Sequence, residues 1–157
     1  SQITLHTSTN YKDLIEFIQG ELHAIGINVK VDASPSASLR DLISKNEINF
    51  FRGSWIADYP DAENYLAMFY SKNKVPIGPN YTAYYNKEFD KLFEESYYVS
   101  DDNERHKLYR QMDQMVIEHA NIVPIFYDQS VTLTQNKISG LVVNPLNLLI
   151  LKTVKKN

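Results

Sequence analysis

In the first third of the chain, runs of apolar residues with strand-like spacing take turns with runs of helical spacing. Apolar and polar residues alternate in residues 3–7 and 27–31, and the apolar run at residues 48–52 predicts a third strand. Between these runs, apolar residues recur at helical spacing, at Leu14, Ile15, Ile18 and Leu22 and then at Leu39, Leu42 and Ile43. Because helical crossovers join parallel strands, this order predicts a β-α-β-α-β unit with a parallel sheet.

Local signals predict where the two helices begin and end. Asn10 can cap the first helix through its side-chain oxygen, and Gly26 can end it. Ser36 or Ser38 can cap the second helix in the same way. We therefore expect each helix to start directly after one of these polar residues.

Beyond residue 60 the pattern changes to helices. Residues 63–70 predict a short helix, and residues 72–79, with a glycine and two prolines, predict a loop. Asn86 can cap a further helix, and Asp101 or Asp102 can open the longest one.

The last part of the chain predicts extended structure. Residues 122–126 and 131–134 favour two strands joined by a polar turn, with Pro124 at an edge or at a strand start. Residues 146–154 are apolar and are expected to be extended. The whole chain, residues 1–157, is therefore expected to form one α/β domain, in which additional helices and C-terminal strands follow the parallel core.

Composition excludes several classes of function. With 157 residues, 43% of them hydrophobic and 22% charged, the chain can bury a real core. A net charge of −3 with no dominant basic patch argues against a nucleic-acid partner. The absence of cysteine excludes disulfides, thiolate catalysis and zinc–thiolate sites.

The candidate site lies where the third predicted strand ends. Trp55, the only tryptophan, follows this strand, and Asp58, Asp61 and Glu63 come shortly after it. Ligands of open α/β sheets tend to bind beyond the carboxyl ends of the strands. A large aromatic side chain beside a carboxylate suits a small cationic or amphiphilic ligand.

Catalysis and metal binding have little support in the sequence. The carboxylates could suggest a glycosidase pair, but Asp61 and Glu63 stand at a predicted helix start, where acidic residues are ordinary partners of the helix dipole. The four histidines form no HExxH motif, and no glycine-rich phosphate motif occurs. The sequence therefore predicts a binding protein that is not an enzyme and needs no cofactor or metal.

Residues 55–66 carry a family resemblance. Their sequence resembles the form W-x-x-D-Y-x-D-P-x-x-F of the family 5 extracellular solute-binding proteins, with Ala62 where a proline is common. These proteins are the peptide- and nickel-type receptors of ABC importers. Further segments that are similar to the family, in the right order, are residues 80–92, 104–117, 123–125 and 140–145.

The resemblance implies a fold and a setting. It implies a lobe like those of type II periplasmic binding proteins, here the C-terminal lobe of a longer, two-lobed receptor. Its partners would be a peptide or other small solute, the remaining lobe and the membrane permease of the importer. The receptor would be extracytoplasmic, in the periplasm or lipid-anchored to the outer face of the cell membrane.

The resemblance also implies roles for single residues. In peptide-binding members the aspartate of W-x-x-D pairs with the ligand's α-amino group, and Asp58 matches that position. Trp55 would wall the pocket, and Arg52 could offer a fork to a peptide carboxylate. The further ligand-binding candidates are Tyr59, Tyr84 and Tyr85.

Other interpretations stay open from the sequence. The ligand could be a nickel chelate, a sugar or another solute instead of a dipeptide or oligopeptide. The chain could also be a regulatory or interaction module that reuses the fold. Trp55 could simply fill the lobe, Asp58 could cap a turn, and Arg52 could be solvated.

Overall fold

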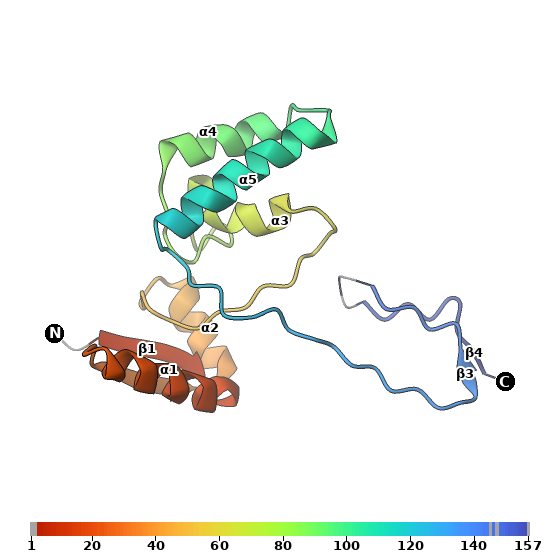
Figure 1. Cartoon of the computed structure of the whole chain (residues 1–157), viewed down its shortest axis with the longest axis horizontal. Coiled ribbons are helices and arrows are strands. Elements are labelled where there is room, and N and C mark those ends of the chain that lie inside the picture. Colours follow the sequence, from red (N-terminus) through yellow and green to blue (C-terminus); the bar gives the residue numbers. More distant parts are fainter. Residues whose placement is uncertain (1–2, 145, 147, 157) are drawn as a thin grey trace.

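The N-terminal part of the chain is a parallel β-α-β unit (Figure 1). The structure is a computed structural model that describes residues 3–144, 146 and 148–156. Strands β1 (Ile3–Ser8) and β2 (Val29–Ser34) pair in parallel along their full lengths. Helix α1 (Lys12–Ala24) joins them and packs its apolar face on the sheet. The predicted parallel arrangement is confirmed for these elements.

The third predicted strand is much shorter than residues 48–52. Helix α2 (Ser36–Ser44) leads into this segment, where Phe51 forms a single parallel bridge with His6 of β1. The Arg52 N–H donates to the His6 carbonyl at 2.8 Å, and the backbone then leaves the sheet. The β-α-β-α-β order and direction are therefore present, but the third strand is reduced to one bridge, because the chain leaves β1 after the Arg52–His6 hydrogen bond.

The predicted caps of α1 and α2 are wrong by one or more residues. Asn10 lies inside a 3-10 turn, η1 (Thr9–Tyr11), which runs directly into α1, so its side chain caps nothing. At α2 the capping position belongs to Pro35, because its carbonyl already accepts the first helical hydrogen bond, from the Leu39 N–H at 3.0 Å. Ser36 is then the first helical residue.

A group of short and long helices forms the second part of the molecule (Figure 1). It contains α3 (Glu63–Leu66), the 3-10 turns η2 (Ala67–Phe69) and η3 (Ser71–Asn73), α4 (Lys87–Ser96) and α5 (Asp102–Glu118). Helices α4 and α5 pack against each other, and α3 contacts α5.

The predicted caps of α4 and α5 are confirmed. The Asn86 side chain accepts hydrogen bonds from the N–H groups of Glu88 at 2.8 Å and Phe89 at 3.1 Å. The Asp101 carboxylate accepts from the Glu104 N–H at 2.9 Å, so Asp102 is the first residue of α5. Each cap satisfies amide groups that have no partner within the helix.

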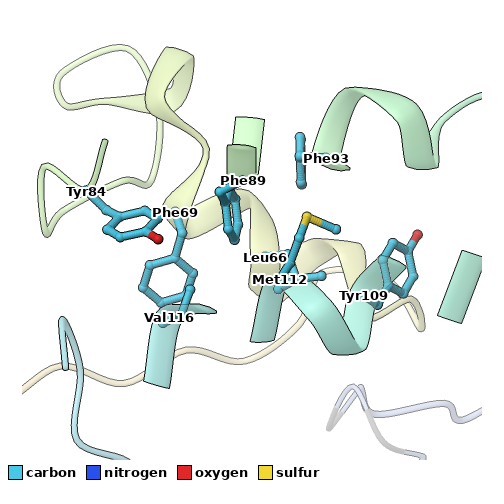
Figure 2. Packing of buried hydrophobic residues seen from close by; sticks show 8 residues of the cluster. All are labelled: Leu66, Phe69, Tyr84, Phe89, Phe93, Tyr109, Met112 and Val116. Atoms are coloured by element: carbon cyan, nitrogen blue, oxygen red, sulfur yellow. The ribbon is translucent and has the colours of Figure 1, made fainter. Parts of the chain in front are cut away.

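The main core lies between α4, α5 and the α3–η2 segment (Figure 2). Phe89 and Met112 are fully buried at its centre, and Phe69 meets both Phe89 and Tyr84 edge-to-face. Burying one such large apolar side chain contributes on the order of 1.5–3 kcal/mol. The eight core residues are Leu66, Phe69, Tyr84, Phe89, Phe93, Tyr109, Met112 and Val116.

After α5 the chain runs away from both parts as an extended arm (Figure 1). Residues 122–126 and 131–134 form no strand in the described structure, so these two predictions are wrong. They lack a neighbouring strand there, although apolar side chains such as Val131 and Leu133 are 81% and 91% exposed. The arm ends in a small antiparallel pair, β3 (Ile138–Ser139) and β4 (Lys155–Lys156).

The predicted extended segment at residues 146–154 is only partly regular. Ile150 forms an antiparallel bridge with Val142, and a turn precedes β4. Pro145, which belongs to the last family-like segment, lies outside the described residues, as does Asn147.

Candidate functional site

An open cavity of about 560 Å³ is lined mainly by residues that follow Phe51 in the sequence. The end of α2, the segment from Trp55 to Asn64 and the loop at residues 73–81 enclose it. Three of the predicted site residues line it together: Trp55, Asp58 and Tyr59. The other lining residues are Ser44, Glu63, Asn64, Ala67, Asn73, Val75, Pro76, Gly78, Pro79 and Tyr81.

Asn64 fixes the segment that carries Trp55 and Asp58. Its side-chain oxygen accepts a hydrogen bond from the Trp55 indole N–H at 2.7 Å and another from the Asp58 backbone N–H at 3.2 Å. Asn64 itself is only 5% exposed, in the short helix α3. The aspartate that could bind an amine is therefore tied to the aromatic wall through one buried amide.

The Asp58 carboxylate is exposed, and it pairs with no cation among the described residues. Its backbone is fixed by Asn64, while its side chain lines the cavity. A carboxylate held in this way can accept hydrogen bonds from a charged donor of a ligand.

Tyr59 turns its hydroxyl to a neighbouring carboxylate. It donates to Glu63, which also accepts a hydrogen bond from Tyr97 at 2.8 Å. Burial raises the pKa of the Tyr59 hydroxyl, the Glu63 carboxylate raises it further, and the Asn64 amide lowers it. Burial and Glu63 likewise raise the pKa of Tyr97. Both hydroxyls are thus neutral donors to Glu63 near neutral pH.

The residues next to Glu63 start α3 and attach it to α5. The Asp61 carboxylate accepts from the Glu63 N–H at 2.9 Å and lies 3.6 Å from the Arg105 guanidinium. Arg105 also pairs with Asp102 at 2.9 Å. Burial, followed by the Asp61 carboxylate, raises the pKa of Tyr109 to about 12. Asp61 and Glu63 are helix-start residues, as the sequence predicts.

Arg52 lies outside the cavity lining. Its guanidinium carbon stands 3.4 Å from the centre of the Tyr11 ring, and one of its nitrogens lies 3.4 Å from the Ser54 hydroxyl. This cation–π contact fixes the side chain on the N-terminal part of the molecule.

Tyr84 and Tyr85 are also outside the cavity lining. Tyr84 is 6% exposed, belongs to the main core (Figure 2), and its hydroxyl lies 2.8 Å from His119 Nδ1. Burial raises the pKa of this hydroxyl. Tyr85, the next residue, is 65% exposed.

Two buried asparagines that the sequence does not single out support the cavity: Asn64 lines it, and Asn80 lies in the adjoining loop without lining it. Asn80 is fully buried and its amide nitrogen donates to the carbonyls of Tyr70 at 3.1 Å and Tyr84 at 2.9 Å. These bonds hold the loop that closes one side of the cavity. Neither Asn64 nor Asn80 has a pattern signal, because asparagine is usually exposed and nothing local marks it as buried.

The described residues offer neither a metal-binding cluster nor a membrane-spanning helix. They contain no group of three or more histidine and acidic side chains arranged to hold a metal ion. Within the same residues, every helix is too short or too polar to cross a bilayer.

A parallel β-α-β unit combined with a ligand-sized cavity is typical of α/β ligand-binding proteins. Residues 2–76 match the profile of the bacterial extracellular solute-binding proteins, family 5 middle region. The match covers just under half of the chain, and it confirms for this segment the family resemblance predicted from the sequence. The family consists of binding proteins and not of enzymes.

Curated relatives support the same assignment. The dipeptide-binding protein DppE of Bacillus subtilis is 27% identical over 156 residues, which are 99% of this chain and 28% of the relative. The probable D,D-dipeptide-binding periplasmic protein DdpA of Escherichia coli is 26% identical over 137 residues, which are 87% of this chain and 27% of the relative. The chain is homologous to binding proteins for dipeptides and oligopeptides, and spans between about a fifth and little more than a quarter of their length.

A solved structure has the same fold. The binding protein DppA of Helicobacter pylori, in complex with the peptide STSA, superposes with a TM-score of 0.83 and 25% identity. The match covers 99% of this chain and 31% of that protein. The chain is therefore a mixed α/β segment of the periplasmic peptide-binding protein fold.

Proposed function

We propose that this chain is a ligand-binding lobe of a receptor that delivers dipeptides or oligopeptides to an ABC importer. The observation that supports this most is the shared cavity of Trp55, Asp58 and Tyr59, in which the Asp58 carboxylate has a fixed backbone and an exposed side chain. Asp58 pairs with the α-amino group of the peptide, and Trp55 forms the wall beside it. An ammonium group that leaves water needs such a charged, hydrogen-bonded partner.

The chemistry of the cavity favours an amino-bearing ligand. Asp58 and Glu63 both line it, whereas Arg52 is held on Tyr11 outside it. Tyr59 and Tyr97 already occupy the Glu63 carboxylate as donors. Asp58 is thus the lining carboxylate that is left for a cationic group of the ligand, among the residues that the structure describes.

The experiment is calorimetry of the receptor with both lobes and alanine peptides of two to five residues, free and N-acetylated. We expect the free peptides to bind and acetylation to weaken binding strongly. Asp58→Asn should weaken binding of free peptides by about a hundredfold, the loss typical of removing one partner of a buried charge pair. Equal affinity for both peptide forms would contradict the role of Asp58.

A matched variant controls for the loss of one negative charge. Asp113 is an exposed residue of α5 that does not line the cavity. Asp113→Asn removes the same charge and should leave both affinities within about twofold, because screening limits the effect of a distant surface charge. A loss as large as that of Asp58→Asn would mean that net charge, and not the pocket, causes the effect.

The proposed receptor has a second lobe, which completes the cavity and covers the extended arm. The open cavity, the exposed apolar arm and the 28% and 31% coverage of the relatives support this arrangement. Unpaired strand-like segments are stabilised when another strand pairs with them. Hydrogen exchange at residues 122–134 should be slower in the two-lobed receptor than in this chain alone. Equal exchange in both would contradict the arrangement.

The same proposal places the receptor outside the cytoplasm, where it meets the importer's permease. One relative is named as periplasmic, and the matching family is described as extracellular. Cell fractionation should find the receptor in the periplasm or on the outer face of the membrane. A cytoplasmic location, or an attached DNA-binding domain, would favour a regulatory module instead.

A further inference from the structure

Two hydrogen-bond donors from the candidate site converge on one buried atom. The Trp55 indole N–H and the Asp58 backbone N–H both point to the Asn64 side-chain oxygen, at 2.7 and 3.2 Å. The two donors are three residues apart in a segment without strand pairing. The shared Asn64 oxygen therefore fixes the position of Asp58 relative to Trp55.

The orientation of the Asn64 amide follows from its neighbours. An amide nitrogen carries two hydrogens and would repel both donors, so the oxygen must face them. The Asn64 amide also lowers the pKa of the Tyr59 hydroxyl, which itself donates to Glu63.

We propose that Asn64 is a positioning residue that sets the selectivity of the pocket for amino-bearing ligands. It holds the Asp58 backbone, and with it the direction of the carboxylate, at a fixed place beside the Trp55 ring. This inference rests on the proposed function. Small displacements of a charged partner are costly, because charge-assisted hydrogen bonds depend on distance and angle.

The first test reads the position of Trp55 without any ligand. Trp55 is the only tryptophan of the chain, so its indole N–H gives one assignable proton–nitrogen NMR signal. Asn64→Leu removes the acceptor at similar volume and should shift this signal upfield and speed its exchange with solvent. Asn64→Asp keeps an acceptor oxygen and should retain the signal. If the leucine variant fails to fold, Asn64→Ser, whose hydroxyl is too short to reach both donors, replaces it.

Asn80 provides a matched control. It is fully buried like Asn64 and makes hydrogen bonds to Tyr70, Thr82 and Tyr84, none of which involves the Trp55 segment. Asn80→Leu should reduce stability, yet leave the Trp55 indole signal in place. An unchanged indole signal in Asn64→Leu, or an equal change in Asn80→Leu, would overturn the inference.

The second test measures selectivity on the receptor with both lobes. Calorimetry gives the ratio of affinities for free and N-acetylated alanine peptides of two to five residues. In Asn64→Leu this ratio should fall about tenfold, as expected when one buried hydrogen bond no longer holds the charge partner. Asn80→Leu loosens the loop beside the cavity, so it should weaken both affinities together and leave their ratio unchanged. An unchanged ratio in Asn64→Leu would overturn the selectivity role.

The two tests separate this inference from the proposed function. If the parent protein binds both peptide forms equally, the amine pairing of Asp58 is wrong, and with it the selectivity role of Asn64. The NMR signal still decides whether Asn64 positions Trp55. If the parent prefers free peptides and Asn64→Leu alters neither signal nor ratio, the positioning role is wrong and the proposed function stands.

Discussion

Replacing Gly78 by alanine tests whether the loop that closes the cavity is packed as tightly as the structure shows. A Cβ atom at Gly78 would lie 2.9 Å from the Cα, Cβ and carbonyl oxygen of Asn73. Carbon atoms normally meet at about 3.5–4.0 Å, so the two backbone segments would have to separate. Both residues line the cavity, and a shift of this loop would change its shape.

The expected loss of stability is modest but measurable. Overpacking of this kind costs about 1–3 kcal/mol, and the lower entropy of an unfolded alanine chain returns about 0.4–1 kcal/mol. We expect Gly78→Ala to lose about 1–2 kcal/mol of unfolding free energy. For a domain of this size, that lowers the melting temperature by about 2–8 °C.

Gly20 offers a matched control for the same substitution. It lies exposed within α1, and a Cβ atom there would meet nothing within 4 Å. Gly20→Ala should therefore stabilise the protein by about 0.5–1 kcal/mol, because glycine is a poor residue inside a helix.

The assay is thermal and urea unfolding of both variants beside the parent protein. Calorimetric titration with alanine peptides should show weaker binding for Gly78→Ala alone. The reasoning would be refuted if Gly78→Ala matched the parent in stability while Gly20→Ala was stabilised as expected.

Two further predictions concern the core around α5. Phe89→Ala should lower the free energy of unfolding in urea by about 3–5 kcal/mol, because Phe89 is fully buried and its removal leaves a cavity. The control Leu133→Ala, at a 91% exposed site, should lower it by less than about 0.5 kcal/mol in this chain. Similar losses in both variants would contradict the described core. Burial and Asp61 raise the pKa of Tyr109 to about 12. The stability that the neutral Tyr109 hydroxyl contributes is therefore complete below about pH 10 and is lost as pH rises through about 12. In melting curves from pH 9 to 12, Tyr109→Phe should flatten this decline, and an unchanged slope would show that other groups cause it.

Local signals predicted the helices that carry their own caps. Asn86 and Asp101 each bond to amide groups two or three residues ahead, so the sequence alone contains the whole interaction. Asn10 failed as a cap because the preceding residues already form a 3-10 turn, which depends on how β1 enters α1. Helix starts were thus predictable where the cap and its partner are close in sequence.

Strands, unlike these helix starts, could not be predicted from local sequence alone. Residues 122–126 form an apolar run and residues 131–134 alternate, but a strand also needs a neighbour, and none lies beside these residues in the described structure. The segment at residues 48–52 does reach β1, yet makes only the bridge at Phe51. A pattern of side chains predicts which residues can pair, and distant parts of the chain decide whether they do.

The candidate site combines both kinds of information. The family motif correctly brought Trp55 and Asp58 together, but the same motif gave no role to Asn64, six residues after Asp58. The segment between Arg52 and Asp61 has left the sheet, so ladder hydrogen bonds cannot fix it, and a buried side chain does so instead. The Asn64 amide can do this because it offers an acceptor and two donors in one plane. The sequence does not reveal this role, because an asparagine is expected to be exposed from its residue type alone. Trp55 and Asp58, which are proposed to bind, could therefore be predicted from the family motif, while the buried Asn64 that contacts both became apparent only from the fold.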